Sequence, residues 1–284
     1  MFKTKKTNVA ILVHACDRYE FLFQGFDYFF SAHWDFKIPG NYYFATEALD
    51  VKINGFENIK SGNGAWADRL AFLLKNEIEE DYILYFQEDM WLSKPVNRKF
   101  FTELFDQAIQ NDWKHVKLHS SDVYKTKPTD NFIEGFNVSE LDNRKSDFLM
   151  SHQVTLWKKD YLLAQLYKNE HPWRNERRAT KRLKKLNPQI FHIDYFSENG
   201  SAEINVNNQP VKRSEYHAVS FNSTLNFNVL EYIKLLNKGK AAQKKYATEL
   251  QDHYDNDLTH DGKPKAKKED VFKKFKNWFT KKKG

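Results

Sequence analysis

The chain has 284 residues, of which 40% are hydrophobic and 16% aromatic, a composition typical of a globular protein that buries a sizeable core. Its net charge of +7 is concentrated in residues 263–284, where ten lysines face only two acids, which leaves about −1 on residues 1–262. A nucleic-acid-binding protein more often carries its positive charge on the folded body. Nucleic acid is therefore not the partner that we expect.

Cysteine content and hydrophobic runs bear on the cellular location. Cys16 is the only cysteine, which excludes an intramolecular disulfide framework. The apolar run that begins VAILVHAC is eight residues long, so it suits a buried strand and is too short to span a bilayer. The N-terminal stretch also lacks the pattern of a secretion signal. We therefore expect a reducing, cytoplasmic environment and no transmembrane helix.

The first part of the chain alternates predicted strands and helices. Strands are indicated by aromatic and β-branched runs, and helices by leucines at helical spacing after turn residues. In order, we predict a strand and a helix in 8–22, strands in 41–47 and 51–56, a helix in 61–78 and, within 81–92, a strand over the run YILYF. This alternation predicts an α/β fold with a mainly parallel sheet and helices on its faces.

Three acidic residues fall at the ends of these predicted strands. Asp17 follows the first strand, and Glu88 with Asp89 follows the hydrophobic run YILYF. In open α/β sheets, ligands bind at the carboxyl ends of the strands. The sequence therefore predicts that these acids lie at a binding site.

Beyond residue 93 the pattern is less regular. We predict helices in 94–112 and 171–186, a short strand in 115–119, a polar loop in 120–147, a strand leading into a helix in 154–169, short strands in 190–218, one helical stretch in 228–250 and a linker in 252–270. The helix in 171–186 starts with a proline and is strongly basic. We accordingly expect one α/β domain in 1–220, a helical extension in 221–251, and a linker with a basic tail in 252–284.

Several short motifs occur in a characteristic order. They are Trp66, Asp68 and Arg69 in GAWADRLAFLL, the Glu88–Asp89 pair, Gln153 and Trp157 in SHQVTLWKKDYLL, and Pro172, Trp173 and Glu176 in PWRNE. Over roughly residues 8–220 this order resembles a group of bacterial glycosyltransferases with a GT-A-like fold, which often occur with capsule, O-antigen or other surface-polysaccharide genes. The resemblance implies a GT-A-like, Rossmann-like domain that uses a nucleotide-sugar donor.

We expect a cation beside the adjacent acids Glu88 and Asp89, because a carboxylate is costly to bury unless a positive charge pairs with it. Transfer of a sugar from a nucleotide donor leaves a diphosphate, whose charge a divalent metal such as Mn²⁺ or Mg²⁺ can neutralise. We assign Asp89 to the metal and Glu88 to the metal or the donor ribose, although adjacent Glu-Asp departs from the commoner D-x-D pattern. The alternative is a surface acidic pair that caps the next segment.

Other residues are assigned to the donor. We expect Asp17 near the donor base or ribose, and Asp68 with Arg69 at a helix start near the same cleft. The alternative for Asp68 is an ordinary first-turn acid, which the helix dipole favours.

Glu176 is the first candidate for the general base, and Asp147 is the reserve. An inverting transfer needs a carboxylate to take the proton of the acceptor hydroxyl. Five cations lie within six residues of Glu176, namely Arg174, Arg177, Arg178, Lys181 and Arg182. They can lower its pKa, or hold donor phosphates or an anionic acceptor. The alternative is that Glu176 is a salt-bridge partner on the helix face.

The sequence thus favours a glycosyltransferase that moves a sugar from a nucleotide sugar to a surface-glycan or lipid-linked acceptor. Two alternatives stay open: a nucleic-acid-modifying glycosyltransferase, and a non-catalytic module that binds carbohydrate or membrane. Salt-dependent binding would favour the first alternative, and failure to bind nucleotide sugars the second.

The tail, residues 264–284, has its own pattern. An apolar stripe at helical spacing is formed by Val271, Phe272, Phe275, Trp278 and Phe279. Beside its lysines, such a stripe suits the surface of an anionic membrane. We predict peripheral attachment to the inner face of the membrane; the alternative is a helix packed on the domain with solvated lysines.

Overall fold

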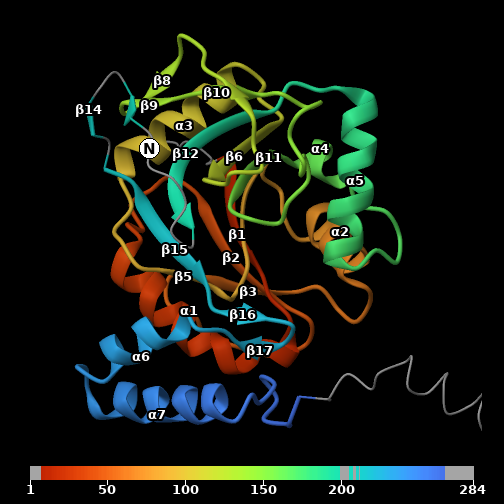
Figure 1. Ribbon diagram of the computed structural model, residues 1–284. Coiled ribbons are helices and arrows are strands. Elements are labelled where there is room, and N and C mark those ends of the chain that lie inside the picture. The colour runs from red at the N-terminus through yellow and green to blue at the C-terminus, as the bar shows by residue number, and fades with distance from the viewer. Residues whose placement is uncertain (1–7, 199–204, 207–208, 211, 266–284) are drawn as a thin grey trace, which may run out of the picture. The chain divides into compact units, whose positions relative to one another are not determined.

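The computed structural model describes residues 8–198, 205–206, 209–210 and 212–265 (Figure 1). The chain divides into two compact units, residues 1–219 and 220–284. The first contains the large sheet and the predicted site residues, and the second contains two helices.

The first unit is built on an 11-stranded sheet with the path β3-β2-β1-β4-β11-β6-β12-β10-β7, while β15 pairs with β12 and β5 with β15. The strands are β1 (Val9–His14), β2 (Asn41–Thr46), β3 (Glu57–Lys60), β4 (Tyr82–Phe86), β5 (Met90–Leu92), β6 (His115–His119), β7 (Thr126–Lys127), β10 (Ser139–Leu141), β11 (Thr155–Lys158), β12 (Phe191–Glu198) and β15 (Ser214–Ala218). Among these described strands, only β5, β10 and β11 run against the direction of β1. The predicted α/β class with a mainly parallel sheet is confirmed.

Helices lie along both faces of this sheet. They are the 3-10 turn η1 (Asp17–Tyr19) and the helices α1 (Glu20–His33), α2 (Trp66–Asn76), α3 (Arg98–Gln110), α4 (Lys159–Leu163) and α5 (Pro172–Leu186). Two hairpins, β8 (Phe132–Ile133) with β9 (Phe136–Asn137) and β13 (Asn205–Val206) with β14 (Gln209–Pro210), complete the unit.

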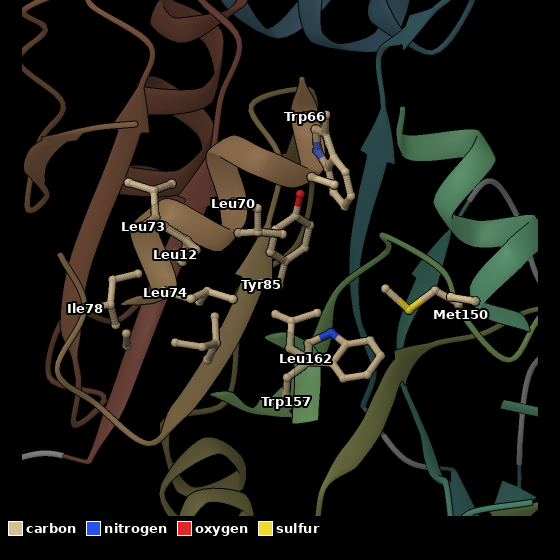
Figure 2. Close-up of a cluster of buried hydrophobic side chains, with 14 of the residues drawn as sticks. Leu12, Trp66, Leu70, Leu73, Leu74, Ile78, Tyr85, Met150, Trp157 and Leu162 are labelled. Carbon is tan, nitrogen blue, oxygen red and sulfur yellow. The ribbon is translucent and has the colours of Figure 1, made fainter. Parts of the chain in front are cut away.

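The central strands are buried on both faces, which explains why β1 and β4 are continuous hydrophobic runs. On one face, the leucines of α2 pack beside Leu12 of β1 and Tyr85 of β4, as Figure 2 shows. On the other face, aromatic rings of α1 cover the sheet, and the ring centroids of Phe30 and Phe86 are 5.6 Å apart. This alternation fixes which residues of β1 and β4 meet each helix.

A glycine in α1 determines how closely the chain after β4 approaches this helix. The buried indole of Trp91 lies against Gly25, and a Cβ atom at that position would overlap the indole ring. The indole N–H of Trp91 also donates a hydrogen bond to the carbonyl oxygen of Glu88, at 3.2 Å. Gly25 therefore makes room for the side chain that holds the Glu88–Asp89 turn.

Most predicted elements of the first unit are confirmed, and three are corrected. Residues 51–56 are not a strand, because Asn54 and Gly55 form a turn in which Gly55 has a φ of 77° and the amide of Phe56 bonds Ile53. The stretch 120–147 is not only loop, since it contributes β7 to β10. The helix predicted within 154–169 is confined to α4.

The second unit contains β16 (Ser220–Phe221), β17 (Thr224–Leu225), α6 (Val229–Leu236) and α7 (Ala241–Asp255). The single helical stretch predicted in 228–250 is two helices, because the backbone at Lys240 is extended and its amide bonds the Gln243 side chain at 2.6 Å. Helix α7 also continues into the first residues of the predicted linker. Among the described residues, no helix is both long and apolar enough to cross a membrane. The apolar stripe of 271–279 lies outside the described residues.

Replacing Gly25 by alanine tests the packing, because helix propensity and steric overlap predict opposite changes in stability. Helix propensity alone predicts that Gly25→Ala stabilises the fold by about 1 kcal/mol. Overlap with Trp91 predicts the reverse, a loss of about 1–3 kcal/mol in the free energy of unfolding. Urea denaturation measures the difference, with Gln24→Ala at the exposed neighbouring position as control. Stabilisation by Gly25→Ala would contradict the close packing.

Candidate active site

The site begins where two neighbouring strands end. Strands β1 and β4 are parallel, with Val13 opposite Phe86, so both lead to the same edge of the sheet. The chain after β1 reaches Cys16 and Asp17, and the chain after β4 reaches Glu88 and Asp89. The sequence prediction that these acids share one strand edge agrees with this register.

Asp17 organises the loop that follows β2. Its carboxylate accepts hydrogen bonds from the backbone amides of Glu47, Ala48 and Leu49, at 2.7, 2.8 and 3.0 Å. The amide of Asp17 in turn donates to Glu47 at 3.3 Å. Asp17 thus fixes the loop at the strand edge.

Arg69 is the buried cation of this edge. It is 6% exposed, and its Nη1 atom lies 3.0 Å from Oε1 of Glu47 and 3.3 Å from the carbonyl oxygen of Ala15. Position 69 follows the first turn of α2, so the helix directs the guanidinium toward the end of β1. Arg69 is therefore already paired with Glu47.

The carboxyl groups of Glu88 and Asp89 are poorly stabilised in their ionised form. Glu88 is buried, and desolvation together with the charge of Asp89 raises its pKa. Burial likewise raises the pKa of Asp89. The amide of Cys16 and the charge of Arg69 oppose the shift at Glu88 but do not outweigh it. This pair is the part of the edge that an additional cation would stabilise.

The donor set at this pair fits a metal only in part. Among the described residues, no group of three or more histidine, cysteine, aspartate or glutamate side chains is arranged to hold a metal ion. Mg²⁺, however, is commonly bound by one or two carboxylates together with the phosphates of a substrate and water. The adjacent carboxylates of Glu88 and Asp89 match that arrangement.

Glu176 occupies a second, partly buried environment on α5. Its Oε1 atom accepts a hydrogen bond from the amide of His152 at 2.9 Å, and burial raises the pKa of its carboxyl group. The charge of Lys117 lowers this pKa less than burial raises it. The arginines that are its sequence neighbours are not among the causes of the shift, because they lie on another side of the helix.

The sequence reasoning missed a buried polar network beside Glu176. Lys117 is fully buried, and its ammonium group donates to Ser151 at 2.9 Å and to the hydroxyl of Tyr124 at 3.2 Å. Burial lowers the pKa of Lys117 to about 7. The hydroxyl of Tyr124 also bonds His119 at 2.8 Å. The strand HVKLH carried the signal, since its alternate positions His115, Lys117 and His119 give β6 one polar face.

Three buried rings form a cluster that reaches from His14 at the end of β1 to His152, whose amide bonds Glu176. The ring centroid of Trp66 is 4.2 Å from that of His152 and 5.7 Å from that of His14. His14 and His152 are both buried, and Nε2 of each has no hydrogen-bond partner among the described residues. Buried ring nitrogens are usually satisfied. These two therefore mark a place where a polar ligand or water would be accommodated.

Two predicted residues lie elsewhere. Asp68 accepts a hydrogen bond from the amide of Asn169 at 3.0 Å, so it fastens the segment that leads into α5. Asp147 is exposed and lines a pocket on the outer side of α5. The structure thus associates Asp17, Arg69, Glu88 and, by sequence, Asp89 with the strand edge.

Comparison with solved structures finds chains of S. aureus TarS. The TarS 1–349 structure is 8% identical, has a TM-score of 0.46, and the match covers 86% of this chain and 71% of that one. The corresponding values are 12%, 0.42, 86% and 70% for its complex with UDP, and 10%, 0.43, 86% and 72% for its complex with UDP-GlcNAc. No protein-family model matches the sequence, and no curated protein does.

The raised pKa of Asp89 predicts that its charge costs stability in the unliganded protein. Because the folded state binds this proton more tightly than the unfolded state, stability falls as pH rises from the ordinary carboxyl pKa through the raised one. We expect Asp89→Asn to raise the Tm at about pH 8 and to change it little at about pH 4.

The control for this experiment is Asp106→Asn, which alters an exposed acid of α3. It should leave the Tm unchanged at both pH values. A lower Tm for Asp89→Asn at the higher pH would mean that the folded chain already supplies a cation to Asp89.

Proposed function

We propose that the protein is a nucleotide-sugar-dependent glycosyltransferase whose donor site lies at the carboxyl ends of β1 and β4. The observation that carries this proposal is the uncompensated pair Glu88–Asp89 at the strand edge. Such a pair suits a ligand that brings a cation, and the diphosphate of a nucleotide sugar binds divalent metals. The motif order that resembles surface-polysaccharide glycosyltransferases supports the same reaction.

Asp89 is the proposed metal ligand, with Glu88 beside it. A bound Mn²⁺ or Mg²⁺ would neutralise the negative charge that develops on the leaving diphosphate. Arg69 keeps Glu47 in place, and Asp17 holds the loop of residues 47–49 that would border the donor nucleoside. Pre-organised groups of this kind need little rearrangement when the donor binds.

Glu176 is the proposed general base. Its carboxylate accepts the proton of the acceptor hydroxyl while the hydroxyl oxygen bonds the anomeric carbon and the bond to the diphosphate oxygen breaks. A carboxyl group with a raised pKa is a stronger base than a solvated one. The hydrogen bond from the amide of His152 orients the side chain. His14, Trp66 and His152 are proposed to line the space between donor and base.

The acceptor is proposed to be a surface glycan or a lipid-linked precursor, as in capsule or O-antigen synthesis. Screening UDP-, GDP-, CMP- and dTDP-sugars by thermal shift, with and without Mn²⁺, identifies the donor, since a ligand of the folded state raises the Tm.

Glu176→Gln tests the base directly. The substituted side chain can still accept the hydrogen bond from His152 but cannot take a proton. We expect kcat for sugar transfer to fall by about 10²- to 10⁴-fold while donor affinity stays within twofold. Asp147→Asn is the control and should keep its kcat. If Asp147→Asn loses activity and Glu176→Gln does not, the base is Asp147.

Peripheral membrane attachment through the basic tail is a separate proposal. Deleting residues 266–284 retains Lys265, whose ammonium group bonds Thr224 and Asp257 at 3.1 and 3.2 Å. We expect the shortened protein to keep its donor affinity and to leave anionic liposomes in a flotation assay. Each lysine near an anionic surface contributes about 1 kcal/mol. Equal flotation of the two forms would refute the proposal.

A further inference from the structure

A pocket of about 630 Å³ lies on the outer side of α5. Five cations of this helix line it: Arg174, Arg177, Arg178, Lys181 and Lys184. Asp147 is the acid among the lining residues, so the side chains leave a large positive excess. None of the residues assigned to the donor lines this pocket.

The cations of the pocket are only weakly compensated by the protein. Arg178 lies 3.7 Å from Glu170, a carboxylate that is also 3.3 Å from Arg182. In the described part of the chain, Lys181 and Lys184 make no ion pair, and both are exposed. Clustered like charges repel one another. An anion in the pocket would relieve that repulsion.

The chemistry of the lining indicates phosphate rather than a single carboxylate. Guanidinium groups bind phosphate oxygens through paired hydrogen bonds, and ammonium groups add point charges. Phe148, which is 42% exposed, supplies an apolar wall next to these cations. A charged wall beside an apolar one suits a phosphorylated chain that has less polar units between its phosphates.

The pocket is also connected to the proposed base. Helix α5 carries Glu176 and, one turn later, Thr180. The hydroxyl of Thr180 accepts a hydrogen bond from the amide of Met150 at 3.1 Å. The segment 147–152 therefore runs along the helix, with Phe148 at the pocket and His152 at Glu176. Glu176 and Lys181 are about 7.5 Å apart along the helix axis. A chain held in the pocket would lie within a few residues of the base.

We infer that this pocket binds the phosphate groups of an anionic acceptor chain. The acceptor role rests on the proposed glycosyltransferase function, whereas phosphate binding can be measured without any sugar transfer. Nucleic acid is a less suitable occupant, because the cations come from one 15-residue helix and residues 1–262 carry a net charge of about −1. Nucleic-acid binding usually needs a longer basic surface.

The test uses the full-length protein and tripolyphosphate as the probe, with binding measured by calorimetry. Lys181→Gln combined with Lys184→Gln should weaken binding at least tenfold. It should also reduce the dependence of log K on log salt, because two fewer cations pair with the probe. The matched control, Lys168→Gln with Lys185→Gln, removes the same charge from exposed positions that do not line the pocket, and should bind as the wild type.

Three other results would overturn the inference, each in a distinct way. Equal loss of affinity in both double variants would mean that net charge alone attracts the probe. A parallel loss of nucleotide-sugar affinity would assign the pocket to the donor. Tighter binding of an RNA oligonucleotide than of a polyphosphate of equal charge would assign it to nucleic acid. If no nucleotide sugar binds while the lysine effect persists, the proposed function fails but the phosphate pocket stands.

Discussion

The parallel pairing of β1 with β4 is the constraint on which the candidate site depends. It places Val13 opposite Phe86, so that the chain after each strand emerges at the same edge of the sheet. If β4 slipped by one residue against β1, Tyr85 would turn away from α2 and the hydrophobic side chains of β4 would leave their packed faces. The burial that stabilises the sheet therefore also sets where the acidic residues meet.

Charge at this edge is balanced for some residues and not for others. Asp17 is stabilised by three amides and Glu47 by Arg69, whereas desolvation dominates at Glu88 and Asp89. A metal–diphosphate ligand would bind the ionised form of these two carboxylates. Binding would then release protons, and affinity would rise with pH across the range in which the pair titrates. The free energy needed to ionise these two carboxyl groups therefore reduces the observed free energy of ligand binding at low pH.

The parts of the fold that the sequence predicts are those with strong local patterns. Strands β1 and β4 are uninterrupted hydrophobic runs, and α2 and α5 have clear helical spacing or a proline start. Strands β7 and β10 are two and three residues long, and they exist because distant segments pair with them. So short a segment has no detectable periodicity. The break near Lys240, in contrast, had a visible signal in Gly239, which is a poor helix former.

The same distinction applies to the site. Acids at predicted strand ends could be located, because the ends of parallel strands meet by geometry. The buried Lys117 network could not, because its partners Tyr124 and Ser151 come from segments without regular pattern. The function of such a network depends on burial, which a residue list does not give. Long-range packing, rather than residue type, decides the pKa of Lys117.

Helix α5 shows why closeness in sequence is a poor guide to electrostatics. At about 100° per residue, the five pocket cations lie about 80° to 200° around the helix from Glu176. Glu176 instead faces the amide of His152, where burial raises its pKa despite the basic sequence around it. A base needs a desolvated carboxylate, and an anionic acceptor needs exposed cations. One amphipathic helix can present both. Its periodicity separates most of the cations from Glu176 by more than a quarter of the helix circumference, and all five lie within about 2.2 turns of it.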